Sequence, residues 1–147
     1  MKMKILNSLA ILAICMSFTP LSDTPWAQDQ LMQPEELVKI LKDAKAKKPV
    51  IINTGTMRNI KTALKYGPVS DPKGLDQFKA EVTKIAKEKE IVIYCGCCKM
   101  GHCPNVQPAY EHLKSNGFSK VKVLNLEEDL VFDWVNKGYP MDAKQPF

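Results

Sequence analysis

The feature of this sequence that most constrains its fold is the run Ile91–Tyr94, which is apolar at every position and rich in β-branched residues. A strand with one face in water alternates apolar and polar residues, whereas an uninterrupted apolar run is typical of a strand buried on both faces. Such strands belong to parallel sheets that helices cover on each side. The run therefore predicts a central strand of an α/β domain, and this strand leads directly into Cys95.

Helical and strand patterns alternate along the rest of the chain. Helices are predicted over residues 34–48, 71–89, 105–116 and 129–137. Asp71 and Asn105 are predicted to be the N-caps of the second and third helices. The fourth helix is predicted to pack Phe132, Trp134 and Val135 against the rest of the domain. Short apolar runs predict further strands over residues 50–52 and 118–126. The alternation predicts one α/β domain with a mainly parallel central sheet flanked by helices, and ligands of such folds bind at the carboxyl ends of the strands.

The N-terminus has the pattern of a signal peptide. Lys2 and Lys4 precede the apolar stretch Ile5–Phe18, which is shorter than the roughly 20 residues that a membrane-spanning helix needs. Cleavage is predicted after Ala27, so residues 1–27 form the signal peptide and residues 28–147 the mature domain. We therefore expect a periplasmic or secreted protein without a membrane anchor, and a domain of about 120 residues can bury its own core without staples.

Composition and charge indicate which classes of molecule the protein can bind. The 147 residues are 45% hydrophobic and 25% charged, which is typical of a globular protein. The net charge of +5 comes from scattered lysines that do not alternate with aromatic residues, so the surface does not have the pattern of a nucleic-acid interface. No pattern in the sequence indicates a cofactor.

Four of the five cysteines lie within residues 95–103. Disulfides inside so short a segment would restrain the unfolded chain only slightly, so structural stapling explains the pattern poorly. Cys95 is predicted to lie between the end of a buried strand and the start of the next helix, where free amides and the helix dipole favour an anionic sulfur. Because the thiolate is the nucleophilic form of cysteine, the loop indicates covalent sulfur chemistry.

The sequence resembles the rhodanese-like family over about residues 34–140. The segments that carry the resemblance are individually short but occur in the family's order: Asn59–Ala63, Ile91–Cys95, Ala109–Leu113 with Asn116–Phe118, Val121–Leu124, and Trp134 with Lys137–Pro140.

The resemblance implies a single rhodanese-like domain and an enzyme similar to thiosulfate sulfurtransferases. Cys95 would take a sulfur atom from a small donor, hold it as a persulfide within a ring of loop amides, and pass it to a thiol or another thiophilic acceptor. Lys99 and His102 would attract an anionic donor. The family needs no cofactor for this chemistry.

The additional cysteines leave other roles open. Cys97, Cys98 or Cys103 can act as a resolving residue that attacks a persulfide on Cys95 and leaves an internal disulfide. The pair Cys95 and Cys98 also resembles the thioredoxin motif, which would make the protein a thiol-disulfide oxidoreductase.

A third interpretation of the loop is a metal site. Cys97, Cys98, His102 and Cys103 are soft or borderline ligands that suit copper(I) or zinc.

Overall fold

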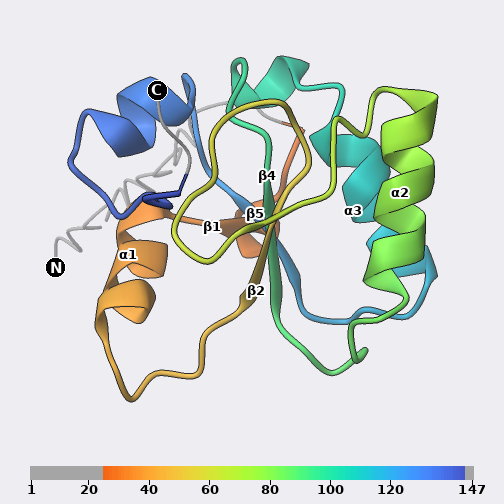
Figure 1. The fold of residues 1–147 in the computed structure, drawn as a ribbon, viewed down its shortest axis with the longest axis horizontal. Helices are drawn as coiled ribbons and strands as arrows, with labels where there is room; N and C mark the ends of the chain where they lie inside the picture. The colour runs from red at the N-terminus through yellow and green to blue at the C-terminus, as the bar shows by residue number, and fades with distance from the viewer. Residues whose placement is uncertain (1–24, 145–147) are drawn as a thin grey trace, which may run out of the picture.

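A five-stranded sheet forms the centre of the computed structural model, which describes residues 25–144 (Figure 1). The strands lie in the order β1-β5-β4-β2-β3, and each neighbouring pair is parallel. Their bounds are Leu31–Met32 for β1, Val50–Asn53 for β2, Leu64–Lys65 for β3, Ile91–Tyr94 for β4 and Val121–Leu124 for β5. The predicted α/β domain with a parallel sheet is therefore confirmed.

The strand β4 lies in the middle of the sheet, as its apolar sequence predicts. All four of its residues are fully buried, at 0% exposure. Alternate side chains enter two different cores: Ile91 and Ile93 pack with α2 and α3, whereas Val92 and Tyr94 pack with α1. The absence of a polar position in β4 thus follows from helices on both faces of the sheet.

The helix α1 (Pro34–Lys42) covers one face of the sheet, and α2 (Pro72–Val82) and α3 (Val106–Ser115) cover the other (Figure 1). A proline in the first turn begins both α1 and α2, where a missing amide proton costs no helical hydrogen bond. Asp71 caps α2 as predicted, because its carboxylate accepts the backbone N–H groups of Lys73 and Gly74.

Several elements are shorter than predicted. α1 ends at Lys42 rather than Lys48, because the Asp43 carboxylate accepts the Lys45 N–H and so favours a turn over further helix. α2 ends at Val82, and the following residues form turns. The strand predicted over residues 118–126 is confined to β5, and the two-residue strands β1 and β3 were not predicted because so few residues carry no periodicity.

The helix predicted over residues 129–137 is a single π-helical turn, Val131–Val135. Trp134 is fully buried, as predicted, but Phe132 is 61% exposed, so the prediction that it packs was wrong. The cause is Asp133, whose carboxylate turns inward to accept the backbone N–H groups of Glu128 and Asp129. With Asp133 and Trp134 both inward, Phe132 is left on the outside of the turn.

The predicted signal peptide, residues 1–27, lies outside the described residues except for Pro25–Ala27. Within this short piece, Trp26 is 8% exposed and packs edge-on against Tyr110, with ring centroids 5.0 Å apart. Cleavage after Ala27 would remove this ring from the core. Among residues 25–144, no helix is both long and apolar enough to cross a membrane.

Candidate active site

Cys95 follows β4 at the carboxyl edge of the sheet and is 1% exposed. At the same edge β2 continues into Thr54 and Gly55, and the Thr54 hydroxyl donates to the Tyr94 carbonyl over 3.0 Å. A Cβ atom added to Gly55 would overlap with Cys95 Sγ and lie 3.3 Å from Cys95 Cα. The absence of a side chain at Gly55 therefore creates the space that the Cys95 thiol occupies.

Asn105 stands at the N-cap position of α3, but its side chain does not cap the helix as predicted. Its Oδ1 accepts the Ser70 N–H over 2.8 Å, and its Nδ2 donates to Cys95 Sγ over 3.3 Å. Asn105 is 4% exposed, so the bond to sulfur is shielded from water. A donor in this position favours negative charge on Cys95, and the sequence shows it only as a capping residue.

The loop after Cys95 folds back so that its thiols gather at one place. Cys97 Sγ lies 3.1 Å from Cys95 Sγ and 3.5 Å from Cys98 Sγ. The Sγ atoms of Cys95, Cys97 and Cys103 all lie within 4.8 Å of one another. Cys97 is exposed, Cys98 and Cys103 are half-buried, and all four are free thiols. The predicted site cysteines thus form one cluster that runs from the core to the surface.

One thiol in the cluster, Cys103, has a lowered pKa. Its pKa is lowered to about 6, because its sulfur accepts a hydrogen bond from the Cys95 thiol and others from the backbone amides of Asn105 and Val106. The pKa of Cys95 is raised, because its thiol donates to Cys103 and is buried. Burial raises the pKa of Cys98 to about 12. The sequence predicted that the amides at the start of the following helix would stabilise a thiolate on Cys95. In the structure these amides donate to the Cys103 sulfur instead.

The difference between the pKa values of Cys103 and Cys98 predicts how the reaction rate of each thiol depends on pH. Alkylation of Cys103 by iodoacetamide is expected to rise through about pH 6 and to level off near neutrality, because only the thiolate reacts. Cys98, with a pKa raised to about 12, is expected to react slowly at neutral pH and to gain rate throughout the alkaline range. Peptide mass spectrometry after short pulses measures both. A Cys103 rate that still climbs about tenfold per pH unit above neutrality would contradict the assignment.

The predicted anion-binding residues Lys99 and His102 lie on the surface of the loop. Lys99 Nζ pairs with Glu128 Oε1 over 3.1 Å, so much of its charge is already balanced by a carboxylate. His102 is exposed at the end of a short 3-10 helix, Met100–His102. A role of either residue in binding an anionic donor stays a prediction.

The predicted metal set is Cys97, Cys98, His102 and Cys103, whereas the structure brings together the sulfurs of Cys95, Cys97 and Cys103. Three thiols at these separations are a ligand set for a soft ion such as copper(I). The exposed His102 is not part of this group.

A cavity of about 10 Å³ lies beside Cys95. This volume corresponds to about one water-sized atom. Its lining includes the three soft sulfur side chains of Cys98, Met100 and Cys103 together with apolar residues. The space fits a single added sulfur atom on Cys95, but it is too small for a whole substrate.

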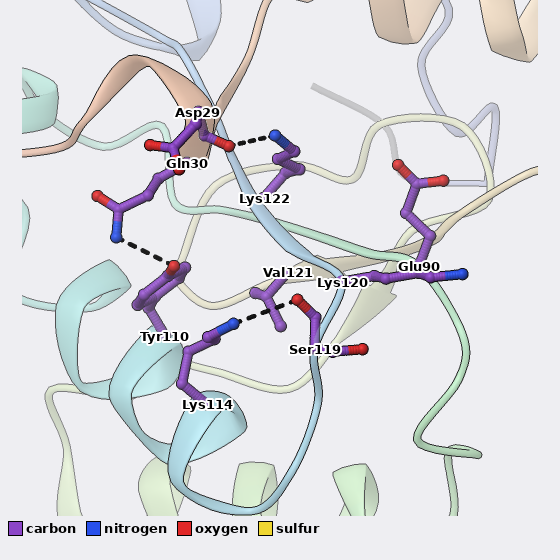
Figure 2. Close-up of a pocket in the computed structure, with 9 residues that line it drawn as sticks. All are labelled: Asp29, Gln30, Glu90, Tyr110, Lys114, Ser119, Lys120, Val121 and Lys122. Carbon is purple, nitrogen blue, oxygen red and sulfur yellow. Dashed lines mark hydrogen bonds between the residues drawn. The ribbon is translucent and has the colours of Figure 1, made fainter.

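A larger pocket of about 360 Å³ lies at the other end of the sheet, near the amino ends of β4 and β5 (Figure 2). Two of the lysines in it are bonded to backbone carbonyl groups: Lys114 Nζ to Ser119 and Lys122 Nζ to Asp29. Their positive charges are therefore partly engaged within the protein. The pocket contains no cysteine and is separate from the thiol cluster.

No protein-family model matches the sequence, and no curated protein matches it. Two solved structures are similar in fold. The Alr3790 protein from Anabaena sp. matches with a TM-score of 0.55 and 17% identity, over 76% of this chain and 90% of its own. EanB, in a variant with a cysteine persulfide in a tetrahedral intermediate state with ergothioneine, matches with a TM-score of 0.55 and 21% identity, over 76% of this chain. This chain spans only 27% of the EanB chain.

At identities of 17% and 21%, these likenesses show a common fold and nothing finer. They agree with the parallel order of the strands and with helices on both faces of the sheet. The single α/β domain that the rhodanese-like resemblance implied is therefore the fold of this chain.

Proposed function

We propose that this protein is an exported sulfurtransferase that carries sulfane sulfur as a persulfide on Cys95 and passes it to a thiophilic acceptor. One observation carries the proposal: a buried thiol at the carboxyl end of the central strand, with a cavity for about one atom beside it and further thiols in contact. The fold shared with EanB, a protein with a cysteine persulfide, supports it. Export rests on the sequence of residues 1–27.

The cluster supplies the groups that sulfur transfer needs. Cys95 gives its proton to the Cys103 thiolate and attacks the outer sulfur of thiosulfate or the terminal sulfur of a polysulfide. The sulfur–sulfur bond of the donor breaks, and sulfite or the shortened polysulfide leaves with the electron pair. The Asn105 amide donates to Cys95 Sγ, which becomes the inner sulfur of the persulfide. An acceptor thiolate completes the cycle by attacking the outer sulfur, and Cys95 recovers its proton.

Sulfur loading is tested by mass spectrometry of the full chain and its peptides after exposure to polysulfide and removal of the donor. We expect the mass of one sulfur atom on the Cys95 peptide, assigned to Cys95 by fragmentation. In Cys95→Ser the retained sulfur is expected to fall to background, because a serine hydroxyl is far less nucleophilic than a thiol. The four remaining cysteines of the variant, three of them in the same loop, are its internal control for unspecific persulfidation.

Two outcomes would overturn the assignment. Sulfur retained on another cysteine to the same extent in wild-type protein and in Cys95→Ser would mean that Cys95 is not the carrier. A loss of two thiols without added sulfur would instead favour the oxidoreductase that the pair Cys95 and Cys98 suggests.

A further inference from the structure

The carrier thiol and the nearest exposed thiol are in direct contact. Cys95 is 1% exposed, and the cavity beside it holds about one atom. An inorganic species one atom wide can reach a sulfur placed there, but a thiol attached to a peptide brings a carbon chain that does not fit. Cys97 is exposed, and its Sγ lies 3.1 Å from Cys95 Sγ. The cluster therefore offers a route from the buried thiol to the solvent.

We propose that Cys97 is the exit cysteine: it takes the sulfane sulfur from Cys95 and presents it to acceptor thiols of peptides and proteins. This inference rests on the proposed function, in which Cys95 carries the persulfide. It adds the route by which the sulfur leaves and the class of acceptor, a thiol too large to enter the cavity.

The transfer needs no oxidant or reductant. The Cys97 sulfur, having given up its proton, attacks the outer sulfur of the persulfide. A new sulfur–sulfur bond forms at Cys97, the old one at Cys95 breaks, and Cys95 Sγ receives the electron pair and the proton. One persulfide and one thiol become one thiol and one persulfide. Attack on the inner sulfur would instead expel sulfide and leave a disulfide, so the two reactions have different products.

The distances place Cys97 within reach of the outer sulfur. A sulfur–sulfur bond is about 2 Å long, so with Cys97 Sγ at 3.1 Å from Cys95 Sγ the outer sulfur lies at most about 5 Å from Cys97 Sγ. In-line attack on the outer sulfur needs the two Sγ atoms about 4–5 Å apart, which the exposed Cys97 side chain reaches by rotating outward from this contact. Cys103 is less suited to this step, because backbone amides of Asn105 and Val106 hold its sulfur in the half-buried part of the cluster. Cys98 lines the cavity beside Cys95, but it is half-buried whereas Cys97 is exposed, and burial raises the pKa of its thiol to about 12.

A single-turnover experiment tests the exit cysteine. Wild-type protein and Cys97→Ser are charged with inorganic polysulfide, freed of donor, and mixed with cyanide or with glutathione. Cyanide is a narrow acceptor and glutathione a bulky thiol. In Cys97→Ser we expect discharge to glutathione to slow by at least about tenfold, with discharge to cyanide unchanged within about threefold. Cyanide serves as the control for the integrity of the charged site within the same variant.

The outcomes of this experiment distinguish a failure of the exit cysteine from a failure of the proposed sulfurtransferase function. Failure to charge Cys95 in the wild-type protein defeats the proposed function itself. Normal charging, followed by equally fast discharge of wild-type protein and Cys97→Ser to glutathione, defeats the exit cysteine alone. Release of free sulfide from charged wild-type protein before any acceptor is added would also defeat it, because that product marks attack on the inner sulfur. Cys97→Ala repeats the test without a hydroxyl.

Discussion

In the Gly55→Ala variant, sulfur retained on Cys95 after polysulfide treatment is expected to fall by at least about fivefold. The added Cβ would overlap with Cys95 Sγ, and the buried thiol has little space in which to turn aside. Overpacking of this kind costs about 1–3 kcal/mol, which corresponds to about five- to 150-fold if the strain falls on the reactive position of the thiol. Peptide mass spectrometry measures the retained sulfur.

Gly74→Ala is the matched control, because it adds the same methyl group at another crowded glycine. Gly74 lies in the first turn of α2, and its added Cβ would overlap with the Pro68 carbonyl oxygen instead of with a thiol. We expect it to lower stability while Cys95 still charges in the folded fraction. Equal sulfur retention in Gly55→Ala and wild-type protein would show that the close approach of Gly55 does not position the Cys95 thiol.

The sequence was sufficient where a structural rule acts on neighbouring residues. The apolar run Ile91–Tyr94 predicts the central strand, because burial on both faces leaves no position for a polar residue. Asp71 followed by a proline predicts the start of α2, because both act within the first turn of the helix. The clustering of cysteines within residues 95–103 likewise predicts that the thiols share one loop.

The parts that could not be predicted depend on contacts between distant segments. Gly55 lies against a thiol forty positions further along the chain, and nothing near it in sequence indicates that contact. Asn105 has the position of a helix cap, yet its side chain bonds to Ser70 and to Cys95 Sγ. A short polar side chain can satisfy either partner, and only the approach of the Ser70 loop decides between them.

The distribution of charge among the thiols has the same origin. The sequence places Cys95 before a helix, which favours its ionisation. The loop between them is long enough for Cys103 to reach the helix amides first, and burial then favours the neutral form of Cys95. A thiol and a thiolate in contact can exchange their proton, but the raised pKa of Cys95 and the lowered pKa of Cys103 keep that proton mainly on Cys95. Cys95 is therefore the nucleophile only in the minor form in which Cys103 holds the proton.

Trp134→Ala is expected to lower the free energy of unfolding by about 3–5 kcal/mol, a large share of the roughly 5–15 kcal/mol of a typical domain. The indole is fully buried, packs edge-on against Tyr139 at 5.3 Å between ring centroids, and donates its N–H to the Pro140 carbonyl over 3.1 Å. Alanine removes all three contributions and leaves a cavity. Urea denaturation followed by circular dichroism measures the change, since the mutation removes one of the two tryptophans that would report by fluorescence.

Phe132→Ala, two residues away in the same π-helical turn, is the matched control. Its ring is 61% exposed, so truncation is expected to change the free energy of unfolding by no more than about 0.5 kcal/mol. Residues two apart on a helical turn point to nearly opposite sides, so with Trp134 buried Phe132 faces the solvent. Comparable losses in the two variants would therefore contradict the turn in which Asp133 faces inward and Phe132 outward, whereas a cost confined to Trp134→Ala follows directly from it.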